Sequence, residues 1–490
     1  MRSRLGRFCT LGLVLLLLLA TGTSNYERRL ATSDRPADAY PILSLKGHHR
    51  LLVVAPHCDD ETLAAGGLIR AARRRGMDVR VVIATAGDGY IRATATWFRR
   101  PPRAADFVAL GQMRQQESLA ALSRLGLDEK EVVFLTYPER RLGVLWWSHW
   151  DTPDRSPFTH RTRNLYPRAF RFNAPYTGQA LLKDLRTLLE TFRPDLIVFP
   201  HPNDEHPDHR ALSVFVRLAV AMEEDRDPDY HPLLLGYLVH YGRFPQPAGR
   251  KPPAFLLPPC PLEPLNEWVQ WPLEESDVAA KEAAVEAYPS QLKVLGRFLR
   301  SFVRQNELFA PLDAVTPLGV VDGAVWQDPE KVLRDWEGTG GLVRDPVKDN
   351  VVRWVAAGAD INHLMLFRAG NLLWVGIELR RPPSSAYKYQ VDLRAVFPDG
   401  ESTTRLGRWG AVRQGEWRAQ GRFLWYRVDL EELGYPTWIA LTVETWGGKC
   451  WNLRPGICSN SNPGRVCFGQ RRSPGRLRPG ASCAAREARR

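Results

Sequence analysis

Short apolar runs alternate with helical patterns between about residues 48 and 305 of the 490-residue chain. The runs are rich in Val, Ile and aromatic side chains, which is typical of buried strands, and the segments between them repeat apolar residues at i, i+3 and i+4, which predicts helices. The expected strands span 51–56, 79–85, 131–137, 195–201 and 234–241, and the expected helices span 62–75, 107–125, 177–192 and 208–224. This alternation predicts an α/β fold with a Rossmann-like, doubly wound, mostly parallel sheet.

The pattern changes near residue 340. Segments such as "NLLWVGIELR" and "YKYQVDLRAVF" alternate apolar and polar residues, turns such as "PDG" separate them, and no helical segment intervenes. A period of two without helices predicts a small antiparallel β-sandwich. We therefore expect an α/β domain at 45–305 that closes with a long helix at 276–304, a linker at 306–340 and a β-sandwich accessory domain at 341–449.

The two ends of the chain differ in character from its body. Residues 1–24 combine arginines, an apolar stretch from Leu11 to Ala20 and small residues, which is the layout of a secretory signal peptide. We expect an exported protein, extracellular or periplasmic, whose mature chain has no transmembrane helix; an uncleaved membrane anchor is the alternative. Residues 450–490 are rich in Arg, Pro and Gly without apolar periodicity, and predict a disordered tail.

The formal charge of +13 is concentrated at these ends. Residues 1–30 hold five arginines against one glutamate, and residues 450–490 hold nine against one. The body of the chain is therefore close to neutral, and we expect no nucleic-acid partner.

Candidate chemistry begins in "VVAPHCDDETLAAGG", residues 53–67, where a buried strand runs into a histidine and three acids. Asp59, Asp60 and Glu61 would repel one another and resist desolvation, so a bound cation is expected near them. Either aspartate could instead serve only as the N-cap of the helix that follows. For Glu61, the charge at a helix N-terminus or a supporting role is favoured over that of a ligand.

A second acidic and histidine-rich cluster, "PHPNDEHPDHRA" at 200–211, follows the strand "DLIVF". If the two strands are parallel neighbours, their carboxyl ends gather six residues: His57, Asp59, Asp60, His206, Asp208 and His209. Two imidazoles and a carboxylate suit a catalytic zinc ion, which leaves one position for water. His201 and Asp204 are interpreted as loop residues near the mouth of the site.

These motifs resemble the N-acetylglucosaminylphosphatidylinositol de-N-acetylase family, also called PIG-L or LmbE-like deacetylases. "PHCDDE" is similar to the family's first motif, and "HPDH" is similar to its second. Supporting stretches are "RQQESLAALSRLG", "ATAGDGY" and "KEAAVEAYPSQ", so that the resemblance covers roughly 48–300. Cys58 departs from the family's usual proline; it is interpreted as a small buried residue, and a role as metal ligand is the less favoured alternative.

The resemblance implies a role for each gathered residue. It implies that His57, Asp60 and His209 hold the metal, which is Zn²⁺ or another divalent ion. It implies that Asp59 is the general base for metal-activated water. It also implies that His206 stabilises or protonates the tetrahedral intermediate, and that Asp208 orients His206 through a hydrogen bond.

The sequence thus predicts an exported zinc-dependent hydrolase that removes the N-acetyl or N-acyl group from an N-acetylglucosamine-type amino sugar. Two alternatives stay open: a sugar- or wall-binding protein with an inactive deacetylase-like domain, and an amidase of non-sugar substrates. Trp146, Trp147 and Trp150 could stack on sugar rings or simply pack a long loop. Because His363 is the only histidine beyond residue 340, the β domain is expected to leave the zinc site assembled without it.

Overall fold

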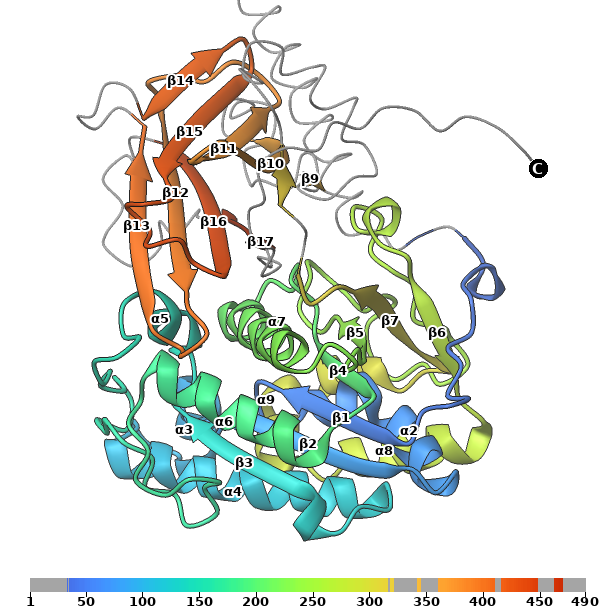
Figure 1. The fold of residues 1–490 in the computed structure, drawn as a ribbon. Helices are drawn as coiled ribbons and strands as arrows, with labels where there is room; N and C mark the ends of the chain where they lie inside the picture. The colour runs from blue at the N-terminus through green and yellow to red at the C-terminus, as the bar shows by residue number, and fades with distance from the viewer. Residues whose placement is uncertain are drawn as a thin grey trace, which may run out of the picture.

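The computed structural model describes Ser33 and residues 35–315, 318–320, 342–344, 360–409, 416–447 and 462–469. Its larger unit is a seven-stranded sheet with the strand order β3-β2-β1-β4-β5-β7-β6 (Figure 1). The strands are β1 (Arg50–Ala55), β2 (Asp78–Thr85), β3 (Val132–Tyr137), β4 (Leu196–Pro200), β5 (Leu233–Tyr237), β6 (Val269–Pro272) and β7 (Asn306–Leu312). The first five pair in parallel, as predicted, and β7 pairs antiparallel with both β5 and β6.

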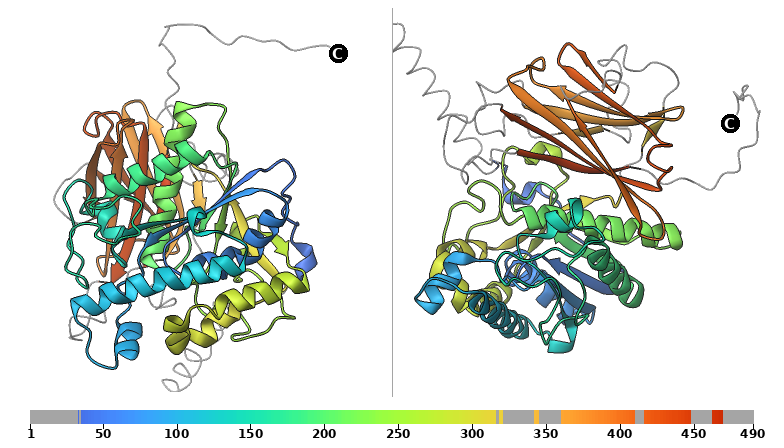
Figure 2. Two further views of the ribbon diagram at one scale, coloured as in Figure 1. Left: turned by 90° about the horizontal axis from the view of Figure 1, so that it is seen from below. Right: turned by 90° about the vertical axis from the view of Figure 1, so that its left-hand side faces the viewer.

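Helices cover both faces of this sheet. They are α2 (Asp60–Arg74), α3 (Ile91–Phe98), α4 (Ala104–Arg124), α5 (Leu142–Trp147), α6 (Gly178–Phe192), α7 (Pro207–Arg226), α8 (Glu275–Val285) and α9 (Pro289–Leu299). Side chains alternate between the faces of a strand. Leu51 and Val53 accordingly pack with α2, α4 and α8, while Leu52 and Val54 pack with α6 and α7. Figure 2 shows the sheet between these two layers.

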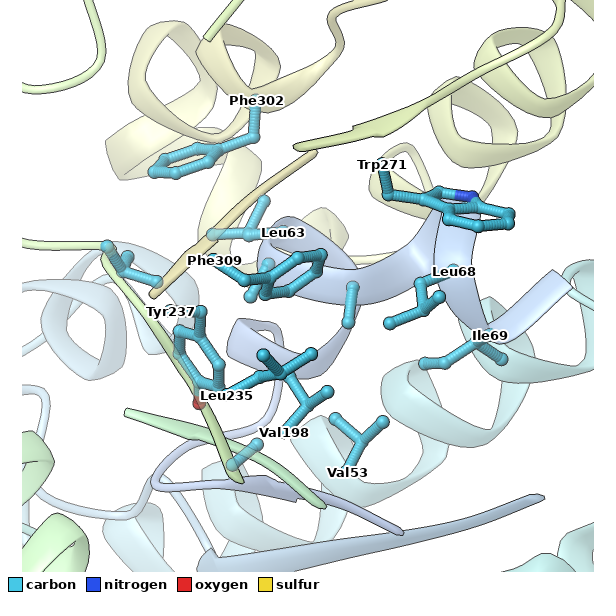
Figure 3. Packing of buried hydrophobic residues seen from close by; sticks show 14 of the residues in the cluster. Val53, Leu63, Leu68, Ile69, Val198, Leu235, Tyr237, Trp271, Phe302 and Phe309 are labelled. Carbon is cyan, nitrogen blue, oxygen red and sulfur yellow. The ribbon is translucent and has the colours of Figure 1, made fainter. Parts of the chain in front are cut away.

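Figure 3 shows how closely the first layer is packed. Val53, Val198 and Leu235 project from three neighbouring strands toward Leu68 of α2 and Phe309 of β7. All five side chains are buried. Because α2 is the helix that follows the first motif, this packing fixes the position at which that helix begins.

The second unit is a β-sandwich, as predicted. One sheet has the order β14-β15-β11-β10-β8, with β9 paired to β10, and the other has the order β13-β12-β16-β17. The strands are β8 (Gly319–Val320), β9 (Leu342–Arg344), β10 (Ile361–Ala369), β11 (Leu372–Leu379), β12 (Tyr387–Val396), β13 (Ser402–Arg408), β14 (Trp417–Gln420), β15 (Phe423–Asp429), β16 (Trp438–Gly447) and β17 (Asn462–Gly469). Leu373 and Val375 of one sheet share a core with Val391 and Leu441 of the other.

Three expected boundaries differ from the structure. The linker expected from 306 begins on β7, whose apolar residues continue the first sheet to Leu312. The single helix expected at 276–304 is divided into α8 and α9 at Tyr288 and Pro289, since proline cannot continue a helix but suits a first turn. Within the tail expected to be disordered, β17 pairs antiparallel with β16, and the rest of that tail lies outside the described residues.

Residues 1–24, the expected signal peptide, also lie outside the described residues. Among the helices that are described, none is long and apolar enough to cross a membrane.

Candidate active site

The six predicted site residues meet where β1 and β4 end. The two strands are parallel neighbours, with Val53 paired to Val198. β1 leads into the turn before α2, and β4 leads into the loop before α7. The sheet order reverses between these strands, which is where open α/β sheets place their sites. Five of the six side chains are buried, namely those of His57, Asp59, Asp60, Asp208 and His209. The side chain of His206 is partly buried.

Asp60 lies between two histidines. Its Oδ2 atom is 3.1 Å from Nδ1 of His57 and 3.1 Å from Nε2 of His209. Burial would raise the pKa of Asp60, but the two imidazoles outweigh it and hold the pKa well below its usual range. A carboxylate that stays ionised between two imidazole nitrogens is a donor set suited to a divalent metal ion.

Each of these histidines meets a second carboxylate at its other ring nitrogen. Nε2 of His57 lies 3.2 Å from Oδ2 of Asp208, and Nδ1 of His209 lies 3.2 Å from Oδ2 of Asp204. Metal-binding histidines commonly have such a partner, because it fixes the tautomer and the orientation of the ring. The geometry therefore leaves His57 Nδ1 and His209 Nε2 facing the same carboxylate oxygen.

Asp204 is a site residue that the sequence interpretation misplaced. The sequence predicts a loop residue near the mouth of the site; Asp204 does lie in the loop after β4, but it is fully buried. Its Oδ1 accepts a hydrogen bond from the backbone N–H of His206, and its Oδ2 accepts from those of Val239 and His240, each at 2.9 Å. Asp204 therefore connects the loop after β4, the loop after β5 and the ring of His209.

The residues present fit a metal ion. His209 is fully buried, yet neither of its ring nitrogens makes a hydrogen bond of good geometry with another described residue. Donor atoms converge in two overlapping groups in which all atoms lie within 4.8 Å of one another: His57, His206 and His209, and Asp60, His209 and His240. His240 was not predicted from the sequence.

Cys58 belongs to neither group among the described residues. It is fully buried, and burial raises the pKa of its thiol well above the usual value. The thiolate is the form that binds metal ions, and burial disfavours that form here. The interpretation of Cys58 as a small buried residue is confirmed.

Asp59 has a strained backbone, with φ of 139°. Its N–H donates to Oε2 of Glu61 at 3.0 Å, and its Oδ2 lies 3.3 Å from Nη2 of Arg114. Burial raises the pKa of Asp59 to about 8; Arg114 opposes this rise, and the charges of Asp60 and Glu61 add to it. Such a carboxylate is a much better proton acceptor than an ordinary aspartate.

Neighbouring side chains hold this strained turn in place. Oε1 of Glu61 accepts hydrogen bonds from Ser118 and Tyr288, each at 2.8 Å. Glu61 is thus a supporting residue, as the sequence favoured. Arg114 donates to the carbonyls of Cys58 at 2.7 Å and Gly87 at 3.0 Å. A side chain at Gly87 would overlap the guanidinium, since a Cβ there would lie 2.3 Å from Nη1.

His206 precedes α7 and caps it. Its Nδ1 accepts a hydrogen bond from the backbone N–H of Asp208 at 3.2 Å. Burial and the nearby charge of His57 lower the pKa of His206. In a neutral imidazole whose Nδ1 is an acceptor, the proton is on Nε2, which is therefore available as a donor.

The carboxylate of Asp208 makes different contacts from those expected. The resemblance implied a hydrogen bond to His206, but the carboxylate contacts His57 and accepts from the backbone N–H groups of Arg140 at 2.5 Å and Leu142 at 3.1 Å. Only the backbone of Asp208 bonds to the ring of His206. The turn from β4 into α7 directs the carboxylate away from His206 and toward the start of α5.

The loop tryptophans pack rather than line the site. Trp146 and Trp150 are buried and lie edge-on to each other, with ring centroids 5.4 Å apart. Both contact Phe215 of α7. The packing interpretation is therefore confirmed for these two rings.

The sequence of the chain is similar to those of known deacetylases. The family model "PIG-L: GlcNAc-PI de-N-acetylase" matches residues 52–220. A 1D-myo-inositol 2-acetamido-2-deoxy-alpha-D-glucopyranoside deacetylase of Mycobacterium sp. (strain KMS) is 29% identical over 300 residues, 59% of this chain and 87% of the relative. One of the same name from Nocardia farcinica (strain IFM 10152) is 33% identical over 161 residues, 32% of this chain and 47% of the relative.

Among solved structures, an N,N'-diacetylchitobiose deacetylase from Pyrococcus horikoshii covers 55% of this chain and 86% of its own, with 17% identity and a TM-score of 0.34. The resemblance predicted from the two motifs is confirmed by the family model and the named relatives. The family model matches residues 52–220, which hold every predicted site residue, and over this region the chain is similar to the PIG-L deacetylases.

Proposed function

We propose that the chain is a metal-dependent deacetylase that hydrolyses the N-acetyl or N-acyl amide of an N-acetylglucosamine-type amino sugar. One observation carries the proposal. Asp60 lies 3.1 Å from a nitrogen of His57 and 3.1 Å from a nitrogen of His209, beside the buried acid Asp59. The family match and the names of the relatives support the reaction and the class of sugar.

His57, Asp60 and His209 would hold the metal. Two imidazoles and one carboxylate are the donors of many catalytic zinc sites, and another divalent ion fits the same donors. When bound, such an ion supplies Lewis-acid chemistry, which makes water more acidic and polarises an amide carbonyl. Asp208 and Asp204 would hold the two histidine rings in the required tautomers.

Asp59 would accept the proton of the attacking water. Its raised pKa gives it the basicity this step requires in neutral solution. The positive charge of Arg114 nearby opposes the rise in pKa, which favours the ionised form that accepts a proton, and it holds the carboxylate in place. Because the Asp59 backbone is fixed by Glu61, the carboxylate does not need to reorganise as the proton moves.

His206 would donate from Nε2 to the oxygen that becomes negative as the amide carbonyl is attacked. The ring is neutral, and its Nδ1 is already occupied by the backbone N–H of Asp208. A fixed donor aimed at developing charge is worth about 10²–10³ in rate in comparable sites. The departing amine needs a proton, and Asp59 would return to it the proton accepted from the attacking water.

The two alternatives make different predictions. A binding protein with an inactive domain would not need a buried general base in a strained turn, because such a turn costs roughly 1–3 kcal/mol. Asp59 has both features. An amidase of non-sugar substrates would use the same catalytic residues, so only substrate preference separates it from the proposal.

We also propose that the protein is exported. The support is the layout of residues 1–24, a basic start followed by an apolar stretch and small residues. Amino-terminal sequencing of the secreted and cell-associated fractions tests this. A chain that retains Met1 in the cytoplasm would contradict it.

The experiment that tests the proposed reaction combines metal analysis with acetate release. The purified full chain should carry about one zinc per chain, lose acetate release on chelation and regain it when zinc is restored. The substrates are an N-acetylglucosamine oligosaccharide and, as the non-sugar comparison, an N-acetylated amino-acid amide. Preference for the second would establish the amidase alternative, and a chain that retains metal but releases no acetate from either would refute the proposal.

A further inference from the structure

The β domain contacts the α/β domain at α5. Arg394 of β12 is buried against three tryptophan rings, with its guanidinium carbon 4.7 Å from the ring centre of Trp150, 5.6 Å from that of Trp146 and 5.9 Å from that of Trp147. Its Nη2 also donates to the backbone carbonyl of Trp147 at 3.2 Å. One side chain of the β domain is thus in contact with the last two residues of α5 and with Trp150, three residues beyond them.

The hairpin that joins β12 to β13 adds two hydrogen bonds to the same region. Nε1 of Trp150 donates to the carbonyl of Gly400 at 3.2 Å, and Nε2 of Gln179 donates to Oε1 of Glu401 at 3.0 Å. In Figure 1 the lower end of this hairpin meets α5. Trp438 of β16 joins the apolar cluster of the α6–α7 layer, so the contact is apolar as well as polar.

The opposite end of α5 reaches the candidate site. The backbone N–H groups of Arg140 and Leu142, at the start of α5, both donate to the carboxylate of Asp208. That carboxylate lies 3.2 Å from Nε2 of His57. A short helix therefore connects the β domain at one end with the partner of a proposed metal ligand at the other.

The contact made by Arg394 is specific in its chemistry. Among the described residues, the guanidinium has no carboxylate within ion-pair distance; it donates instead to Trp147 and to the hydroxyl of Ser402. A buried guanidinium is stabilised here by aromatic faces and two oxygens, an arrangement that depends on the domains staying together. The same cation would be better solvated in water if the β domain were a freely moving module.

We propose that the β domain is a positioning element for the active site: by holding α5 through Arg394, it fixes the backbone N–H groups that orient Asp208 and, through it, His57. This differs from the expectation that the β domain leaves the zinc site assembled without it. The consequence for the reaction rests on the proposed function, whereas the consequences for α5 and for metal binding do not.

The test uses the full chain with two substitutions of Arg394 and one matched control. Arg394→Ala removes the contact, and Arg394→Lys keeps the charge but loses the planar group. Leu393→Ala is the control, because Leu393 is the preceding residue of β12 and is buried in the sandwich core on the other face of the strand. It weakens the β domain without touching α5.

Three measurements are made on each variant: amide hydrogen exchange of peptides that cover 140–147, zinc affinity by competition with a chelator, and kcat and KM for acetate release. Arg394→Ala should speed exchange at 140–147 and weaken zinc binding and kcat by about tenfold each, with KM changed less than twofold. Arg394→Lys should recover part of each effect. Leu393→Ala should change none of the three, although its thermal midpoint falls.

Two outcomes would overturn the inference. One is a folded Arg394→Ala chain with normal exchange at 140–147 and normal zinc affinity. The other is a Leu393→Ala chain that shows the same changes as Arg394→Ala, since general loosening of the β domain would then explain both. If Arg394→Ala does not fold, Arg394→Lys with normal exchange and zinc affinity refutes the inference equally. A wild-type chain that binds zinc without releasing acetate refutes the proposed function alone, because the exchange and zinc measurements still decide this inference.

Discussion

Replacement of Asp204 by asparagine tests the proposed metal site most sharply. The carboxylate receives four contacts: the backbone N–H of His206 at one oxygen, and those of Val239 and His240 together with the ring of His209 at the other. An amide has one oxygen, so its NH₂ group must face one of these donors. The orientation that loses least keeps the oxygen toward His209 and leaves the N–H of His206 without an acceptor.

The expected loss of metal affinity follows from these contacts. Asp204→Asn loses one backbone hydrogen bond and replaces the charged contact with Nδ1 of His209 by a neutral one, and polar contacts with a charged acceptor are about twice as strong as those with a neutral one. Partners of metal-binding histidines contribute about 10- to 100-fold to metal affinity. We expect a loss at the lower end, about tenfold, because the amide oxygen still lies beside Nδ1; a tenfold loss corresponds to about 1.4 kcal/mol.

The assay is a zinc titration of the metal-stripped full chain against a competing chelator. Asp184→Asn is the matched control, because Asp184 is a buried carboxylate of α6 that accepts from Tyr137 and Arg171 at 2.7 Å and contacts no proposed ligand. The control should lower stability and leave zinc affinity unchanged. Equal zinc affinity in Asp204→Asn and wild type would refute the reasoning, since His209 would then not be a ligand held by Asp204.

Two further substitutions distinguish a metal ligand from the general base, and a third tests stability. His209→Ala should abolish zinc binding, whereas Asp59→Asn should keep the metal and lower kcat by about 10²–10⁴-fold; loss of metal in both would show that Asp59 is itself a ligand. Lys281→Met should lower the free energy of unfolding by about 3–5 kcal/mol, because it leaves the fully buried Glu307 without its cation, 2.6 Å away. Denaturant unfolding measures this, and a loss under 1 kcal/mol would mean that the backbone N–H groups of Gly67 and Leu68, which donate to Glu307, are sufficient to stabilise it.

Much of the fold can be predicted from the sequence because the spacing of apolar residues differs between helices and strands. All five predicted strands of the α/β unit are present, each end within four residues of its predicted position, and their parallel pairing follows from the helices between them. The position of the site follows by the same logic: motifs at the ends of β1 and β4 must meet if those strands are neighbours. Residue type and strand order together were sufficient to gather His57 and His209.

Contacts between loops that are far apart in the sequence cannot be predicted from such a pattern. Asp204 lies in a loop with neither a helical nor a strand period, and its partners Val239 and His240 follow a different strand. Nothing local distinguishes a buried carboxylate there from an exposed one. β7 was missed for a similar reason, since a strand that returns antiparallel after a long excursion follows none of the alternation that predicts the others.

The same distinction explains how the chain tolerates Cys58 where the family it resembles usually has proline. A proline would restrict the turn through its own backbone. Here the neighbours restrict it instead: Arg114 binds the carbonyl of Cys58, and Glu61 binds the N–H of Asp59. Glu61 is in turn fixed by Tyr288, which lies between α8 and α9, far along the chain. A strained residue persists only where its surroundings over-determine it. The geometry of Asp59 is therefore set by tertiary contacts that the motif "PHCDDE" cannot reveal by itself.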